Sequence, residues 1–285
     1  MAFASFAQLL RAAQDKPLWQ AVLDDDCEDR LAQSGASFEK MRGMYRAMAA
    51  ARDAYAPDER SQSGLVGGDG GRMADYARAG ETLCGPFVSA VIAQALQMGE
   101  SNACMKRIVA APTAGACGVL PAVLLPYQAA HGLSEDEMVR ALYVAAGIGQ
   151  IIATRAFIAG AAGGCQAEIG SAAAMGAGAL THLGGGDAQA VAHSAAMALK
   201  NLLGLVCDPV AGLVEVPCVK RNVIGAMAAL SSAEMALAGI RSAIPPDEVV
   251  DAMREVGEKM DVSLRETGEG GLANTPCGRC ARERL

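Results

Sequence analysis

The sequence predicts an all-α protein, a single compact domain of alanine- and glycine-rich helices packed around glycine-rich loops. Apolar residues recur at helical spacing in several stretches, whereas regular period-two alternation, a βαβ rhythm and a fixed-period repeat are not found. Hydrophobic residues make up 52% of the chain and aromatic residues only 4%, and there are 33 glycines. Small side chains favour close helix packing, and 285 residues are enough to bury one large core.

Charge and cysteine content exclude several classes of protein. The net charge of −7 and the pI near 5.1 argue against a nucleic-acid partner, which would require a basic face. The most apolar stretches, 109–130 and 142–164, are interrupted by prolines or by Gln150 and Arg155, so we expect buried core helices and no membrane span. Nine cysteines without a signal-peptide pattern indicate reduced thiols and a cytoplasmic protein.

The N-terminal part of the chain is expected to be helical as far as about Tyr55. Residues 1–37 are interpreted as an N-terminal helical segment, in which Leu18 and Val22 share an apolar face. The methionine-rich stripe in 38–48 has the same spacing and predicts core packing.

A loop is predicted over residues 57–80, where glycine and polar residues dominate. It has no preceding strand pattern and lacks the lysine of a phosphate-binding glycine loop. We expect it instead to close over a small polar ligand, with Ser63 and Asp69 as contacts.

Helical periodicity continues after this loop. Residues 87–98 form a strong helical run, and the capping box of Ser134 and Glu137 opens another helix. Arg155, in the apolar continuation of that helix, either pairs with an acid such as Glu168 or meets an anionic substrate. Further helices are expected over 171–183, 187–205, 223–240 and 247–260, before a glycine-rich tail over 266–285.

The segment 110–121 is short, punctuated by glycine and polar only at Thr113. Backbone N–H groups at 115–118, ahead of the next helix, are suited to binding a carboxylate. An ordinary turn between two helices is the alternative.

Three of the nine cysteines, Cys165, Cys207 and Cys218, are flanked by glycine or proline. Asp208 and Val216 each precede a proline, which disfavours helical backbone at both positions. Each cysteine is therefore expected at a break in regular structure, where three thiolates can share an iron–sulfur cluster. An open iron on such a cluster would be a Lewis acid suited to dehydration. Buried unliganded thiols are the alternative, and zinc is disfavoured because only Cys277 and Cys280 form a short-spaced pair.

Four motifs together carry a resemblance to a known family. The chain from about Phe38 onward resembles the α subunit of bacterial iron–sulfur L-serine dehydratases, through the motifs SGLVGGDGGR, APTAGACGVLP, GGCQAEIGSAAAM and NLLGLVCDPVAGLVEVPCVKRN. The resemblance implies one serine dehydratase α-type catalytic domain over 1–285, all-helical, with a 4Fe–4S cluster on Cys165, Cys207 and Cys218. It implies conversion of L-serine to pyruvate and ammonia. The implied substrate contacts are Ser63, Asn102, Thr113, Gly115 and Arg221, of which Arg221 would also steady the cluster's charge.

The chain departs from that family's pattern in two respects. Single-chain members carry a second domain with an SxSHT-type motif thought to supply the base, but here the histidines are His131, His182 and His193, none in such a motif. The resemblance therefore implies a separate β subunit and a hetero-oligomer. In some members a C-terminal cysteine is a fourth, displaceable cluster ligand. Here Cys280 or Cys277 is a candidate for that role, or neither is.

Other functions remain open at this stage. A related iron–sulfur lyase acting on L-cysteine would share the cysteine pattern and release sulfide. A non-catalytic metal-binding or interaction subunit would need no cluster chemistry. A pyridoxal-phosphate dehydratase would need a Schiff-base lysine and, for serine, an α/β fold, and neither is evident.

Overall fold

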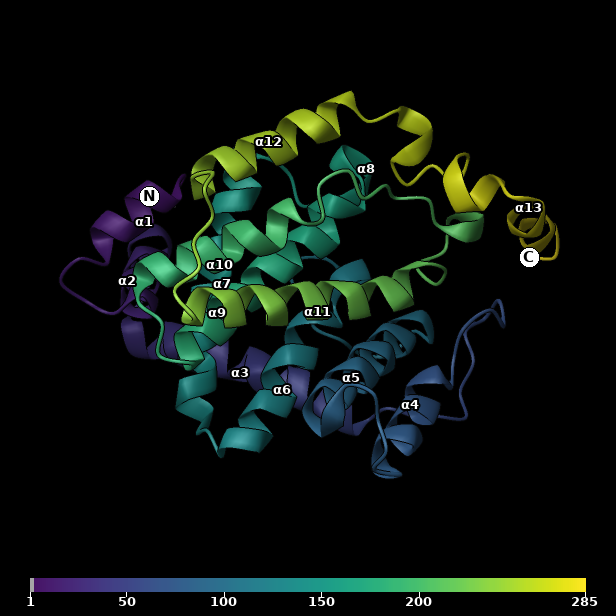
Figure 1. Cartoon of the computed structure of the whole chain (residues 1–285), viewed down its shortest axis with the longest axis horizontal. Helices are drawn as coiled ribbons and strands as arrows, with labels where there is room; N and C mark the ends of the chain where they lie inside the picture. Colours follow the sequence, from purple (N-terminus) through teal and green to yellow (C-terminus); the bar gives the residue numbers. More distant parts are fainter. Residues whose placement is uncertain (1–2) are drawn as a thin grey trace.

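The helical periodicity of the sequence becomes an almost wholly helical chain in the computed structural model, which describes residues 3–285 (Figure 1). Over these residues there are no β-strands, and the all-α, single-domain prediction is confirmed. The α-helices are α1 (Phe6–Ala12), α2 (Leu18–Arg30), α3 (Ser34–Asp53), α4 (Asp69–Arg78), α5 (Gly85–Ala103), α6 (Val119–His131), α7 (Glu135–Arg155), α8 (Gly160–Gly163), α9 (Ser171–Leu183), α10 (Ala188–Lys200), α11 (Cys218–Leu237), α12 (Pro246–Lys259) and α13 (Pro276–Glu283). Five short turns are η1 (Ala114–Ala116), the π-helical η2 (Gln166–Gly170), η3 (Val210–Gly212), η4 (Val262–Leu264) and η5 (Gly271–Asn274).

Helix α9 forms the centre of the core. It packs against α6, α7, α10 and α11, and every residue from Ser171 to Thr181 is buried. Its glycines allow neighbouring helices to approach closely: Gly176 faces Ala229 on α11, and Gly178 faces Ile148 on α7. The predicted packing of small residues is therefore how the core of the molecule is built.

The predicted helix boundaries hold in part. The capping box at the start of α7 is confirmed, since the Ser134 hydroxyl accepts from the Glu137 N–H and the Glu137 carboxylate accepts from the Ser134 N–H. The helices expected over 171–183 and 247–260 are also found. The helix expected over 187–205 ends at Lys200, and the one expected from 223 begins five residues earlier, at Cys218, and ends at Leu237.

The prediction of a loop over the whole of 57–80 is wrong in its second half, which forms helix α4. Local sequence does not cap this helix. The Glu100 carboxylate, 2% exposed on α5, instead accepts hydrogen bonds from the N–H groups of Asp69 (2.7 Å) and Gly70 (3.1 Å). A carboxylate at a helix N-terminus satisfies free donors and complements the helix dipole. The capping group comes from 31 residues away, so a local reading of the glycines could not find it.

Arg155 pairs with an acid, as one of the alternatives predicted, but the acid is Asp251 and not Glu168. Arg155, at the end of α7, forms a bidentate ion pair with Asp251 on α12, with both N–O distances at 2.7 Å. The planar guanidinium matches the carboxylate fork, which fixes α12 against α7. Arg155 is therefore satisfied within the fold.

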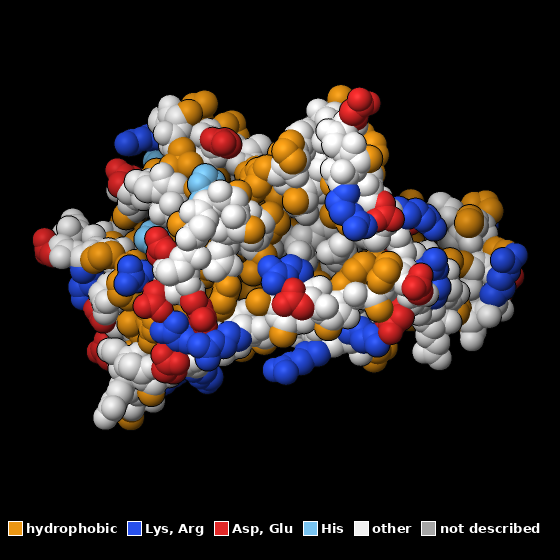
Figure 2. Space-filling view, turned by 90° about the horizontal axis from the view of Figure 1, so that it is seen from below, with side chains coloured by type: hydrophobic (Ala, Val, Ile, Leu, Met, Phe, Trp, Pro, Cys, Tyr) orange, Lys and Arg blue, Asp and Glu red, His pale blue; other side chains and the backbone are white. Residues whose placement is uncertain are grey.

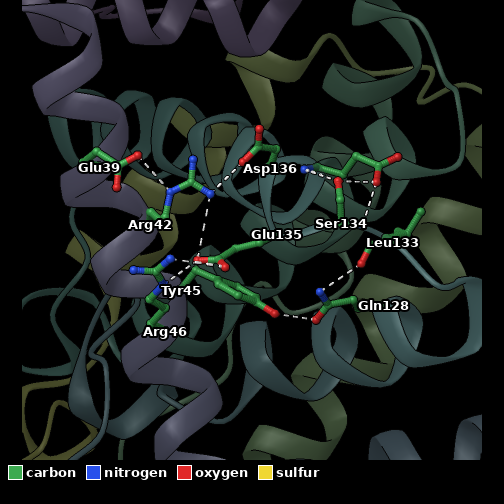
Figure 3. Close-up of polar contacts among 10 residues, drawn as sticks. Glu39, Arg42, Tyr45, Arg46, Gln128, Leu133, Ser134, Glu135 and Asp136 are labelled. Atoms are coloured by element: carbon green, nitrogen blue, oxygen red, sulfur yellow. Dashed lines mark hydrogen bonds and ion pairs between the residues drawn. The ribbon is translucent and has the colours of Figure 1, made fainter.

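A surface network joins α3 to the start of α7 (Figure 3). Arg42 contacts Glu39 at 3.0 Å and Asp136 at 2.6 Å, and Arg46 contacts Glu135 at 2.6 Å. The acids of the first turn of α7 also complement its dipole. The acidic partners of Arg42 and Arg46 are partly or largely open to solvent, which weakens each pair, so the network mainly orients the two helices.

Charge and apolar surface are mixed on the face that carries α4, α5 and α6. Basic and acidic side chains are interspersed there, and hydrophobic side chains gather in a hollow near its middle (Figure 2). These three helices line a groove of about 320 Å³ that includes Leu125 and Pro126. Within residues 3–285, no helix is both long enough and apolar enough to cross a lipid bilayer.

Two glycine-to-alanine substitutions test the close packing with opposite signs. An added Cβ at Gly225 on α11 would lie 2.9 Å from the γ-methyls of both Ile169 and Val119, whereas Gly43 on α3 has nothing within 4 Å. We expect Gly225→Ala to destabilise the fold by about 1–3 kcal/mol through overpacking. We expect Gly43→Ala to stabilise it by about 0.5–1 kcal/mol through helix propensity. Chemical denaturation measures both, and a Gly225→Ala protein as stable as the wild type would contradict the packing.

Candidate metal centre and adjoining cavity

Two of the three predicted cluster cysteines, Cys165 and Cys207, lie at breaks in regular structure, and the third, Cys218, begins a helix. Cys165 follows Gly164, whose φ is +76°, and directly precedes the π-helical turn η2. Cys207 lies in extended backbone, where its N–H donates to Leu264 O (2.8 Å) and its carbonyl accepts from Glu266 N–H (2.7 Å). Cys218 is the first residue of α11, after Pro217. In Figure 1 the segment between Cys207 and Cys218 reaches the end of the molecule where α13 lies.

Cys165 and Cys207 are neighbours in space. The interaction between their two sulfurs lowers the pKa of Cys165 and raises that of Cys207. Arg221 acts in the same direction on Cys165, lowering its pKa further. Burial, followed by the charge of Cys165, raises the pKa of Cys218 to about 12. All three sulfurs are buried and electrostatically coupled, although they lie up to 53 residues apart in sequence.

A buried ion pair stands beside these sulfurs. Arg221 donates to the Asp208 carboxylate (2.8 Å) and to Val206 O (2.7 Å). It therefore binds the residues on both sides of Cys207. The other Asp208 oxygen accepts from Leu272 N–H at 2.8 Å. Burial lowers the pKa of Arg221, but Cys165 and Asp208 outweigh it and the net shift is upward. The guanidinium is thus a fixed positive charge at the cysteine centre.

Two carboxylates and a glycine complete the surroundings of Cys207. An added Cβ at Gly160 would lie 2.8 Å from Cys207 Sγ, 2.9 Å from Glu168 Oε2 and 3.2 Å from Glu266 Oε2. Burial raises the pKa of Glu168, and the nearby Glu266 raises it further against a lowering hydrogen bond from Thr113. Glu266 has φ +64°, a left-handed conformation that is uncommon for residues other than glycine and recurs at functional sites.

Of the backbone N–H groups at 115–118 that were predicted to bind a carboxylate, those of residues 116–118 are engaged within the protein. The N–H groups of Ala116 and Cys117 are used within the turn, and Gly118 N–H donates to the Asn222 side chain at 2.8 Å. Thr113 Oγ1 donates to Glu168 at 2.6 Å, and the same carboxylate lies against Gly115. The turn therefore binds a carboxylate of the protein through the Thr113 hydroxyl, and carboxylate binding by the Gly115 N–H stays a prediction.

A cavity of about 710 Å³ adjoins the turn and is lined by two of the predicted substrate contacts, Ser63 and Asn102. Its lining includes Ser63, Asn102, Ala114 and Glu215. Ala114 lies between Thr113 and Gly115, so these two predicted contacts flank the cavity wall. Arg221 is not in the lining and belongs to the cysteine centre. Asp69, expected to contact a ligand, pairs with Arg72 at 2.7 Å and Lys220 at 3.3 Å.

The two C-terminal cysteines lie apart from the buried three. Cys277 and Cys280 are exposed on α13, a helix that the sequence reading placed within a glycine-rich tail. α13 packs on η3 and η5. In this arrangement both thiols face solvent beside the loop that carries Cys207.

The donor set fits a thiolate-ligated cluster better than a single ion. Over residues 3–285, no three or more side chains of His, Cys, Asp and Glu converge in a way that would hold one metal ion. A four-iron cluster makes a different demand, because each iron takes its own thiolate and the sulfurs need not surround one point. Buried soft donors, a neighbouring cation and a glycine that leaves room at Cys207 meet that demand.

Sequence reasoning missed three acids at this site. Glu168 was noticed only as a partner for Arg155, and Glu266 and Glu215 were not singled out. Glu215 carried a usable signal, since it interrupts the apolar run GLVEVPC three residues before a candidate ligand. Glu266 is held near Cys207 by backbone hydrogen bonds between two segments that lie 59 residues apart in sequence. The residues around Glu266 therefore carried no local signal of this position.

The chain is similar in sequence to serine dehydratase alpha chains. The family model "Serine dehydratase alpha chain" matches residues 13–273. A Bacillus subtilis protein named "Probable L-serine dehydratase, alpha chain" is 51% identical over 219 residues, covering 77% of this chain and 73% of its own. The Peptoniphilus asaccharolyticus "L-serine dehydratase, alpha chain" is 42% identical, covering 92% and 91% respectively. "L-serine dehydratase 2" of Escherichia coli is 44% identical over 63% of this chain but only 40% of its own.

Proposed function

Because the chain belongs to the serine dehydratase alpha chain family, we propose that it is the catalytic α subunit of a cytoplasmic, iron–sulfur-dependent L-serine ammonia-lyase. The reaction removes water from L-serine, and the resulting enamine tautomerises and is hydrolysed to pyruvate and ammonia. The proposal is supported by three buried cysteines, Cys165, Cys207 and Cys218, that interact electrostatically beside the buried Arg221, within the region matched by the family model.

We assign Cys165, Cys207 and Cys218 as the ligands of a 4Fe–4S cluster. When bound, such a cluster would supply a Lewis-acidic iron that makes the substrate hydroxyl a better leaving group. Arg221 places a buried positive charge near the Cys165 sulfur, which favours the thiolate form that a cluster requires. Asp208 holds that guanidinium in place and ties Cys207 to the segment around Leu272.

We place the substrate in the 710 Å³ cavity, at the wall formed by Ser63, Asn102 and Ala114, the last of which lies in the turn between Thr113 and Gly115. This turn stands between the cavity and Glu168, the carboxylate that interacts with all three thiols. Asn222, 1% exposed, fixes the turn by donating to Gly115 O (2.9 Å) and to Cys218 O (3.0 Å). The cavity wall and the cysteine centre are thereby held in one rigid frame.

We further propose that a separate β subunit with an SxSHT-type motif supplies the base and makes the enzyme a hetero-oligomer. Two of the three histidines lie elsewhere: the His131 ring is tilted against Tyr127 with centroids 4.2 Å apart, and His182 lies at the opposite end of α9 from Cys165. Two relatives are named alpha chains, and the Escherichia coli relative extends well beyond the matched region. Both facts support a division of the catalytic groups between two chains.

Co-expression with a candidate β subunit, followed by anaerobic purification, tests this function. We expect pyruvate from L-serine and little sulfide from L-cysteine. Sulfide release as the main activity would instead support the L-cysteine lyase alternative. A preparation with zinc or no metal, inactive on both substrates, would support a non-catalytic interaction subunit.

A further inference from the structure

A buried carboxylate at the cavity has no cationic partner among residues 3–285. Glu215 is 5% exposed and lines the 710 Å³ cavity. Its Oε2 accepts hydrogen bonds from the hydroxyls of Ser61 (2.8 Å) and Ser63. Within residues 3–285, its carboxylate forms no ion pair with Lys, Arg or His. Lysines on adjoining segments are engaged elsewhere, Lys106 with Glu59 at 2.7 Å and Lys220 with Asp69 at 3.3 Å.

Burying the Glu215 carboxylate without a cationic partner costs free energy. Two neutral hydroxyls satisfy part of the hydrogen-bonding capacity of the carboxylate but leave its charge uncompensated. Truncating one partner of a buried charge pair is strongly destabilising for the same reason. The charge of Glu215 therefore predicts a cationic group on whatever occupies the cavity.

The position of Glu215 relates this cation to the proposed chemistry. Glu215 is three residues before Cys218 and hydrogen-bonds to Ser63, which with Asn102 also lines the cavity. Arg282 and Arg284 line the same cavity, so it offers both signs of charge. A zwitterionic amino acid carries one group for each sign.

We propose that Glu215 binds the α-ammonium group of the substrate and thereby selects amino acids over the corresponding hydroxy acids. This inference rests on the proposed function for the identity of the substrate. Ser61 and Ser63 are positioning residues that orient the carboxylate. An ammonium donates up to three hydrogen bonds, and a hydroxyl in its place cannot neutralise the buried charge.

L-Alanine and L-lactate test the proposal, because they differ at the amine and neither has a hydroxyl to eliminate. Their inhibition constants are measured against L-serine in the cluster-loaded α–β complex, and their affinities for the same complex by calorimetry. We expect the wild type to bind L-alanine about 30-fold or more tighter than L-lactate, the factor expected for a buried charge pair. In Glu215→Gln the ratio should fall to about one, with L-lactate binding changed less than about threefold.

Two variants separate charge from structure. Ser61→Ala keeps the carboxylate and should keep most of the preference for L-alanine. Glu215→Asp keeps the negative charge but moves it back from the cavity by one methylene group. If the Glu215→Gln protein does not fold, Glu215→Asp is used in its place. The Glu215→Asp protein should lose affinity for L-alanine and not for L-lactate. An unchanged ratio in Glu215→Gln, an equal loss for both ligands, or a wild type without preference would overturn the proposal. Calorimetry needs no turnover, so a complex inactive on L-serine refutes the proposed function without deciding the role of Glu215.

Discussion

Replacing Cys207 with alanine is expected to abolish the brown iron–sulfur absorption of the protein and to lower L-serine turnover by about 1,000-fold or more. The estimate corresponds to about 4 kcal/mol of lost transition-state stabilisation, in the range of Lewis-acid catalysis. Cys207 is buried, its thiol contacts Cys165, and Gly160 leaves room for its sulfur. Absorption spectra of anaerobic preparations and a pyruvate assay measure the two effects.

Cys117→Ala is the matched control for this experiment. Cys117 is equally buried, at 2% exposure, and burial raises its pKa to about 12. Its sulfur contacts Met98 O at 3.6 Å, and we assign it no ligand role. We expect this variant to keep absorption and turnover while losing about 1 kcal/mol or less of stability from a small cavity. Retained activity in Cys207→Ala, or equal losses in both variants, would contradict the assignment.

Replacing Asp208 with alanine is expected to lower the free energy of unfolding by about 3–5 kcal/mol, as when one partner of a buried ion pair is removed. The substitution leaves the Arg221 guanidinium, whose side chain is 14% exposed, without its carboxylate. It also removes the acceptor of Leu272 N–H. Chemical denaturation of the variant measures the loss.

The double variant Asp208→Ala with Arg221→Leu distinguishes an uncompensated charge from lost packing. If the buried charge dominates, removing both partners should cost less than the sum of the two single substitutions, by about 1–3 kcal/mol of coupling. Additive losses would show that the pair contributes little. Asp251→Ala, which breaks the more exposed pair with Arg155, should cost less than Asp208→Ala.

Sequence could predict those features that depend on local pattern. Helical periodicity and the capping box at Ser134 each depend on residues close together in sequence. They predicted the fold class and the start of α7 correctly. The breaks at Cys165 and Cys207 followed in the same way from neighbouring glycine and proline. The backbone at Cys218 was predicted only in part. Proline is common at the start of a helix, and here Pro217 directly precedes α11, of which Cys218 is the first residue.

The remainder depended on contacts between distant segments. Helix α4 is capped by Glu100, and Arg155 found Asp251, 96 residues away. Glu168 reached the turn at Thr113 through the packing of η2 against η1. Such partners are decided by how helices cross, and one sequence does not specify which of several acids an arginine or a helix terminus will meet.

In the proposed enzyme, three buried thiols jointly hold an inorganic cluster, and iron and acid-labile sulfide analysis tests this assignment most directly. The chain is purified or reconstituted without oxygen, and both elements are measured per chain in the wild type and in Cys207→Ala. We expect about four irons and four sulfides per chain in the wild type, as for a 4Fe–4S centre, and a large loss of both in the variant. Zinc, iron without sulfide, or equal contents in the two proteins would contradict it.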